Sequence, residues 1–162
     1  MILVIDSSAL ITLAKVGQLD LLRQLAETVM IPSAFYDEVV HSGRGRAGSD
    51  EVSRSEWIRV RQVVNREGAS RLRGQIGRGE AESIVLAQEI QADLLILDDA
   101  VARRLAEEHG LPVAGLLGLL AYAKERGKIS ALRPMLDAIR AAGFYLDDRL
   151  YESLLRHTGE GP

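Results

Sequence analysis

Short apolar runs alternate along the chain with longer stretches in which apolar residues recur every three or four positions. Two of the runs, at 2–5 and 94–97, contain no polar residue and show no alternation. Runs of this kind are typical of strands that are buried on both faces of a parallel sheet. Shorter runs at 28–31 and 112–114 and an alternating stretch at 56–64 are three further candidate strands.

Stretches with helical periodicity separate these candidate strands. Strands that alternate with helices predict an α/β fold, in which helices cover both faces of a parallel sheet. The length fits one domain, and we expect this domain at 1–157 with a disordered tail at 158–162. Helices are expected at 8–16, 18–27, 34–41, 67–75, 80–90, 100–109, 116–125, 130–141 and 147–156.

Acidic residues follow directly after the two most apolar runs. Asp6 follows the run at 2–5, and Asp98 and Asp99 follow the run at 94–97. Ligands of an open α/β sheet bind beyond the carboxyl ends of the strands, where the strand order reverses. If the two strands are neighbours at that point, Asp6 and Asp98 face each other and resist ionising together. A divalent cation removes this conflict, so the pattern predicts a Mg²⁺ or Mn²⁺ site.

The same acids also have a purely structural explanation. An Asp after a strand can cap the helix that follows, and capping and metal binding explain Asp6 equally well. Capping requires only one residue of the pair Asp98 and Asp99, so the pair is the better indication of a ligand site. Glu80 and Glu82 lie in the first turn of a helix, where the helix dipole favours carboxylates whatever their function.

Composition and charge indicate where in the cell the protein acts and which class of molecule it could bind. The chain has no cysteine, which excludes disulfides and thiolate zinc sites. It has no apolar run of membrane-spanning length and no secretion-signal pattern, so we expect a cytoplasmic protein. Residues 41–78 contain nine arginines and four acidic residues, a net charge of +5, whereas the rest of the chain has −8. Arginine forms bidentate bonds to phosphate, although a solvated arginine-rich surface would give the same pattern.

Three stretches of the chain together resemble one protein family. They are VIDSSALITLAKVGQLDLL at 4–22, Ile31-Pro32 followed by Glu38-Val39, and GRGEAESIVLAQEIQADLLILDD at 77–99. These stretches resemble PIN-domain ribonucleases and, more closely, the VapC-like toxins of bacterial toxin–antitoxin pairs. The resemblance extends from Met1 to about His157. It implies a three-layer sandwich whose five-stranded parallel sheet has the order 3-2-1-4-5, with the first and fourth strands adjacent.

The resemblance also implies which residues form the site. The family has one acid after the first strand, one on the helix after the second, one at the start of the helix before the fourth, and one after the fourth. The matching catalytic candidates are Asp6, Glu38, Glu80 and Asp98, with Glu82 and Asp99 as alternates and Ser8 in support. The implied ion is Mg²⁺ or Mn²⁺, and its candidate ligands are Asp6, Glu80, Asp98 and Asp99.

Two positions depart from the family pattern. The third acid is commonly Asp, and we prefer Glu80 to Glu82 there because Glu80 lies 18 residues before Asp98, which is the family spacing. The family often has Thr or Ser shortly before the fourth acid, where this chain has Ile96 and Leu97. One polar contact of the family site is therefore missing.

The activity implied by the resemblance is metal-dependent cleavage of single-stranded or looped RNA, which leaves a 5′-phosphate. Carboxylate oxygens suit hard cations such as Mg²⁺ and Mn²⁺. A toxin role, a small antitoxin partner and a homodimer are implied in the same way. The candidates for contacts to the RNA backbone are Arg44, Arg46, Arg71, Arg73 and Arg78. We interpret Tyr122, Tyr145 and Tyr151 as packing or interface residues, because no basic stripe interleaves them.

The alternative function is a catalytically inactive domain of the same fold that binds RNA or protein. The missing Thr or Ser supports it, and the presence of all four acids speaks against it. Other α/β classes fit less well. Phosphatases of the haloacid-dehalogenase type need a second Asp where this chain has Ser8, and P-loop and dinucleotide-binding proteins need glycines after the first strand.

Overall fold

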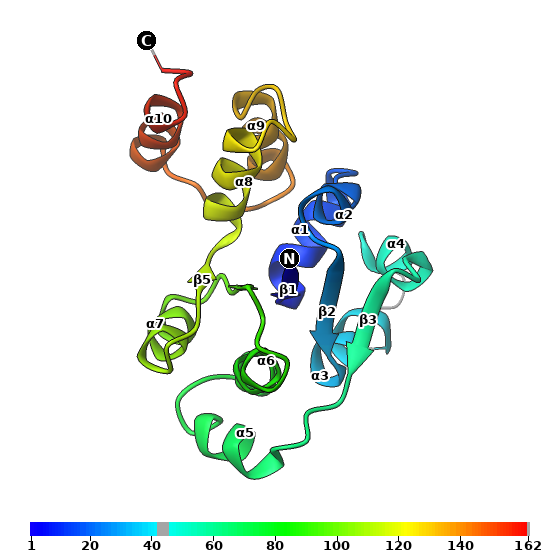
Figure 1. The fold of residues 1–162 in the computed structure, drawn as a ribbon. Coiled ribbons are helices and arrows are strands. Elements are labelled where there is room, and N and C mark those ends of the chain that lie inside the picture. Colours follow the sequence, from blue (N-terminus) through cyan, green and yellow to red (C-terminus); the bar gives the residue numbers. More distant parts are fainter. Residues whose placement is uncertain (42–45, 162) are drawn as a thin grey trace.

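The computed structural model describes residues 1–41 and 46–161. Within these residues one parallel sheet has the strand order β3-β2-β1-β4-β5, as expected (Figure 1). Ile5 of β1 pairs with Ile96 of β4, so the two strands that precede the acids are neighbours. The strands are β1 (Ile2–Ile5), β2 (Thr28–Pro32), β3 (Ile58–Arg61), β4 (Leu94–Ile96) and β5 (Val113–Ala114).

Helices connect the strands at nearly all of the expected places. The helix expected at 34–41 is divided into α3 and a π-helical turn, η1, and α4 was not expected because it is short and follows a glycine-rich stretch. No helix in the described parts of the chain has the length and apolar character needed to cross a membrane. The helices are α1 (Ser7–Lys15), α2 (Asp20–Leu25), α3 (Ser33–Tyr36), η1 (Asp37–His41), α4 (Ser49–Arg54), α5 (Arg66–Leu72), α6 (Arg78–Glu89), α7 (Ala100–Glu108), α8 (Leu116–Glu125), α9 (Arg133–Ala141) and α10 (Asp148–His157).

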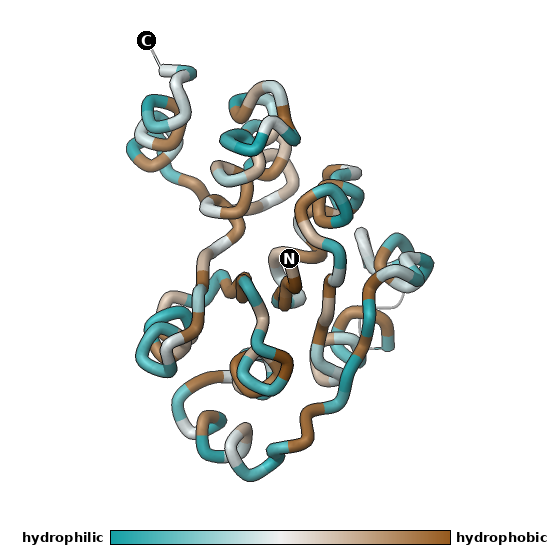
Figure 2. The backbone as a smooth tube through the Cα atoms, in the orientation of Figure 1, coloured by the Kyte–Doolittle hydropathy of each residue, from teal (hydrophilic) through white to brown (hydrophobic). Residues whose placement is uncertain are grey.

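The two faces of the sheet support two separate apolar clusters. Successive residues of a strand point to opposite faces, so Leu3 and Ile5 pack on one side of the sheet and Val4 packs on the other. The first cluster includes residues of α1, α2, α8, α9 and α10, and the second includes residues of α5, α6 and α7. In Figure 2 the central strands are mostly brown and the outer sides of the covering helices carry teal residues. The three-layer arrangement thus matches the expectation.

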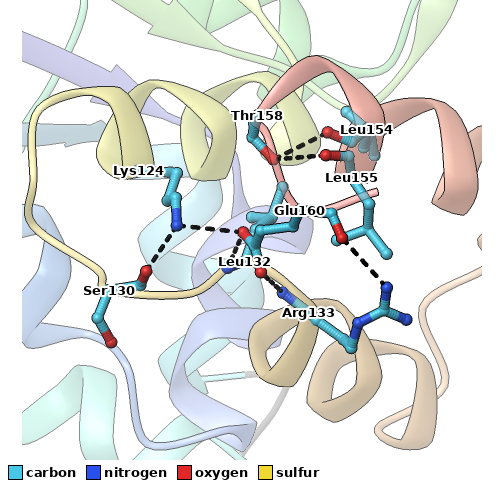
Figure 3. A network of polar contacts seen from close by, with 8 residues as sticks. All are labelled: Lys124, Ser130, Leu132, Arg133, Leu154, Leu155, Thr158 and Glu160. Carbon is cyan, nitrogen blue, oxygen red and sulfur yellow. Dashed lines mark hydrogen bonds and ion pairs between the residues drawn. The ribbon is translucent and has the colours of Figure 1, made fainter. Parts of the chain in front are cut away.

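The end of the described chain folds back onto α8 and α9 (Figure 3). The carboxylate of Glu160 accepts hydrogen bonds from the Leu132 amide at 2.5 Å and the Arg133 amide at 3.2 Å, and it lies 3.4 Å from Lys124 Nζ. Glu160, which is remote in sequence, therefore accepts hydrogen bonds from free amides at the start of α9. Glu160 thus makes specific contacts within the segment expected from the sequence to be a tail, and residue 162 lies outside the described part.

Gly79 allows α6 to pack closely against α3. A Cβ atom at Gly79 would overlap the ring of Phe35, which is only 2% exposed. Gly79→Ala should lower the free energy of unfolding by about 1–3 kcal/mol, because overpacking outweighs the gain in helix propensity. Gly74→Ala is the matched control, since a Cβ there has its nearest neighbour at 3.7 Å. Equal denaturation midpoints for the two variants would contradict this packing.

Candidate acidic active site

Asp6 joins the carboxyl ends of β1 and β4. Its Oδ1 accepts a hydrogen bond from the Ala9 amide, and its Oδ2 accepts one from the Asp98 amide, both at 2.8 Å. The Asp6 amide in turn donates to the Ile96 carbonyl at 2.9 Å. Asp6 is therefore the N-cap of α1, which is the structural explanation given above for an Asp after a strand. It also bonds the backbone of Asp98, and only 3% of its surface is exposed.

The adjacent residues Asp98 and Asp99 have different partners. Asp99 caps α7, because its Oδ1 accepts a hydrogen bond from the Ala102 amide at 2.8 Å. Asp98 Oδ1 accepts one from the Leu116 amide at 2.9 Å, at the start of α8. Asp98 Oδ2 is buried and has no hydrogen-bond partner among the described residues. Asp98 is thus the residue of the pair whose second oxygen is buried without a partner, and it also lines the cavity described below.

Burial and mutual repulsion disfavour ionisation of these acids. Burial, followed by the negative charge of Asp98 and more weakly that of Glu80, raises the pKa of Asp6 from 3.8 to about 7. Burial also raises the pKa of Asp98, although the Leu116 amide, the Arg103 charge and the Ser8 hydroxyl oppose this shift. We call Asp6, Glu80 and Asp98 the acid cluster, because the charges of Asp98 and Glu80 both act on Asp6.

The remaining acidic candidates have different surroundings. Glu82 is 8% exposed, and its carboxylate accepts hydrogen bonds from Arg78 Nε at 2.9 Å and the Ala34 amide at 3.4 Å. The bond from Ala34 ties α6 to α3, and the bond from Arg78 lies within α6, so Glu82 has a structural role. Glu38 lies on the π-helical turn η1 and is exposed, and its Oε2 accepts a hydrogen bond from the Ser7 hydroxyl at 3.3 Å.

A cavity of about 1000 Å³ lies beside the acid cluster. Asp98, Glu38, Ser7 and Ser8 line one part of it. The start of α8 also belongs to its wall, as does the segment at 142–145 between α9 and α10. The cavity therefore extends from the carboxyl ends of β1 and β4 to the C-terminal helices, in agreement with the usual position of ligands in open α/β sheets.

Arg103 is a site residue that was not identified from the sequence. Its Nη1 donates hydrogen bonds to the carbonyls of Leu97 at 2.8 Å and Asp98 at 2.7 Å, and the residue lines the cavity. Arg103 thereby fixes the backbone that carries Asp98. The available signal was its spacing, because Arg103 lies one helical turn after Asp99 and so faces back toward the strand end.

Most of the arginines proposed to contact RNA do not lie at this cavity. Arg44 falls outside the described residues. Arg71 pairs with the exposed Glu67 at 3.3 Å, while Arg73 and Arg78 line a separate cavity of about 240 Å³. Of the predicted arginines within the described residues, Arg46 alone lines the cavity beside the acids.

The spacing of the acids does not form a closed metal site. Within residues 1–41 and 46–161, no three His, Asp or Glu side chains come close enough together to hold one metal ion. The acid cluster instead offers the buried carboxylate of Asp6, whose charged form is disfavoured by Asp98 and Glu80, and a buried oxygen without a partner among the described residues, Asp98 Oδ2.

Comparison with known proteins agrees with this architecture. Residues 2–160 match the model of the DUF3368 family, which is described as a PIN domain. A solved PilT N-terminus domain protein from the hyperthermophilic archaeon Sulfolobus solfataricus P2 has a similar fold, with a TM-score of 0.57 and 23% identity over 76% of this chain and 93% of that chain. No curated protein matches. Because the family model spans almost the whole length, the chain belongs to the PIN-domain family, whose members are generally nucleases.

Proposed function

We propose that this PIN domain is a Mg²⁺- or Mn²⁺-dependent endoribonuclease that cuts single-stranded or looped RNA. The observation that carries the proposal is the pair Asp6 and Asp98 at the ends of adjacent strands, beside a cavity. Strongly perturbed carboxylates in a cleft are typical of functional sites, because burying them without a use costs stability. The resemblance to PIN-domain ribonucleases supplies RNA as the substrate class.

The acid cluster fits a hard divalent cation. All of its donors are carboxylate oxygens, and Mg²⁺ is usually held by one or two carboxylates with water completing its shell, so a closed group of three is not required. Asp98 and Asp6 would hold the ion, and Glu80 would act beside them. A bound ion would lower the pKa of a water molecule and neutralise charge on the scissile phosphate.

The chain's own residues prepare this site before any ion binds. The amides of Ala9 and Asp98 fix the orientation of the Asp6 carboxylate, and the Leu116 amide fixes that of Asp98. Arg103 holds the backbone at Leu97 and Asp98 and brings a positive charge to the wall of the cavity. Such preorganisation reduces the cost of reaching a reactive geometry.

We also propose the toxin role of a toxin–antitoxin pair, with a small antitoxin protein as partner, a homodimeric state and a cytoplasmic location. The support for these finer points is the resemblance of 4–22 and 77–99 to VapC-like toxins.

A catalytically inactive PIN domain that binds RNA or protein is the second candidate. Two observations favour it. The described acids do not form a group of three around one point, and Ile96 and Leu97 are fully buried where family members often have Thr or Ser. This candidate predicts RNA or protein binding without cleavage.

The test is cleavage of a panel of single-stranded, hairpin and duplex RNAs in Mg²⁺, in Mn²⁺ and in EDTA. We expect products with 5′-phosphates from single-stranded and looped RNA in either metal and none in EDTA. Asp6→Asn should be inactive, and Asp20→Asn is the matched control because Asp20 is an exposed acid on α2. RNA binding without cleavage under every condition would favour the inactive domain.

A further inference from the structure

Tyr145 is a large aromatic residue that the fold leaves uncovered. It lies between α9 and α10 with 85% of its surface exposed, and it lines the same cavity as Asp98 and Glu38. Tyr151, by contrast, is buried and donates a hydrogen bond to Asp137 at 2.6 Å. Of the packing or interface roles expected for the tyrosines, Tyr151 therefore has the packing role, whereas Tyr145 does not pack within the fold.

The backbone that carries Tyr145 is firmly held. Gly143 has a φ of +102° and ends α9, and the Phe144 amide donates to the Ile139 carbonyl at 3.0 Å. This is the pattern of a Schellman C-cap, which favours glycine at the left-handed position. Immediately after Tyr145, Leu146 is buried, and its carbonyl accepts a hydrogen bond from Arg140 at 2.7 Å. The ring therefore projects from a firmly held turn, so the turn itself would lose little conformational entropy when a ligand stacks on the ring.

Positive side chains line the same cavity as the acids and this ring. Lys15 at the end of α1 and Arg46 are both exposed and both belong to the cavity wall, as does Phe144 next to Tyr145. Grooves that bind single-stranded nucleic acid combine cations that follow the backbone with aromatic rings on which bases stack. A volume of about 1000 Å³ lies at the upper end of the range for small-ligand pockets, which suits a polymer segment.

We propose that Tyr145 stacks on a nucleobase of a single-stranded RNA whose phosphates contact Lys15 and Arg46 on the way to the acid cluster. RNA as the ligand rests on the proposed function. Bases in a duplex are already stacked on each other, so the ring would select unpaired over paired substrate. Tyr145 acts on binding and register, and the acids act on the bond that is cut.

The experiment measures binding of a short single-stranded RNA that carries 2-aminopurine, a base whose fluorescence falls on stacking, at successive positions. EDTA prevents cleavage. In the wild type we expect quenching at one position. Tyr145→Ala should abolish that quenching and weaken affinity roughly 5- to 100-fold, the range for loss of one base–aromatic stack. Tyr145→Phe should retain both, and Tyr122→Ala, which alters a tyrosine outside the cavity wall, should behave as the wild type.

Abasic RNA and kinetics separate stacking from other roles. An RNA that lacks the base at the quenched position should bind the wild type and Tyr145→Ala equally. Under cleavage conditions Tyr145→Ala should raise KM and leave kcat unchanged. The stacking proposal would be overturned if Tyr145→Ala bound single-stranded RNA as tightly as the wild type does. It would also be overturned if Tyr145→Ala lost as much affinity for abasic and duplex RNA as for the intact single strand. Quenching without cleavage would support stacking and contradict only the nuclease function. Cleavage that Tyr145→Ala does not affect would support the nuclease function and contradict stacking.

Discussion

Asp98→Asn should abolish RNA cleavage and leave the fold and the RNA affinity intact. Asn retains a carbonyl oxygen that can accept the hydrogen bond from the Leu116 amide, so the local structure should persist. The substitution removes the negative charge and the unpartnered Oδ2. Loss of a residue that only supports a metal ligand costs about 10- to 100-fold, so loss of a ligand should lower the single-turnover rate at saturating RNA by at least about 100-fold.

Asp99→Asn is the matched control, because it makes the same chemical change one residue away. Asn caps a helix about as well as Asp, so this variant should keep the stability of α7 and the wild-type cleavage rate. The opposite result, an inactive Asp99→Asn and an active Asp98→Asn, would exchange the roles of the two residues. If both variants cut RNA at the wild-type rate, the nuclease function of this acid pair is wrong.

The two central strands could be predicted because their signals are local, whereas the order of the sheet was implied by the family resemblance. β1 and β4 are apolar without alternation, and each is followed directly by Asp. The observed pairing of Ile5 with Ile96 brings Asp6 and Asp98 together. The family spacing favoured Glu80 over Glu82, and residues two positions apart point in different directions on a helix. In the structure Glu82 binds Arg78 and α3, whereas Glu80 contributes to the electrostatics of Asp6.

Other features of the site depend on contacts between distant parts of the chain. Asp98 and Asp99 cannot be distinguished by spacing, because the direction of each carboxylate is set by the amides of Leu116 and Ala102. Arg73 is close in sequence to the acidic helix α6 but lines the other cavity, whereas Tyr145 is remote in sequence and lines the cavity beside the acids. Proximity in the sequence therefore does not identify which residues line the cavity beside the acids.

The pH dependence of stability should show directly that Asp6 is held under unfavourable charge. Between about pH 4 and pH 7 the folded state retains a proton on Asp6 that the unfolded state has released, because burial and Asp98 raise the folded pKa to about 7. The unfolding free energy should therefore fall as pH rises through this window. At about 1.4 kcal/mol per pKa unit, the fall contributed by Asp6 is up to about 4 kcal/mol.

Asp6→Asn should remove this slope and cross the wild-type curve. The amide side chain has one acceptor oxygen, so it can serve only one of the Ala9 and Asp98 amides, a loss of about 1 kcal/mol at every pH. The variant should therefore be the less stable protein at pH 4.5 and the more stable one at pH 8. Denaturant titrations in EDTA across this range measure the difference, with Asp20→Asn as an exposed-acid control. Parallel stability curves for the wild type and Asp6→Asn would mean that Asp6 is a helix cap with an ordinary charge. If the curves cross in EDTA and Mg²⁺ makes the wild type the more stable protein at pH 8, the repulsion is one that a cation relieves.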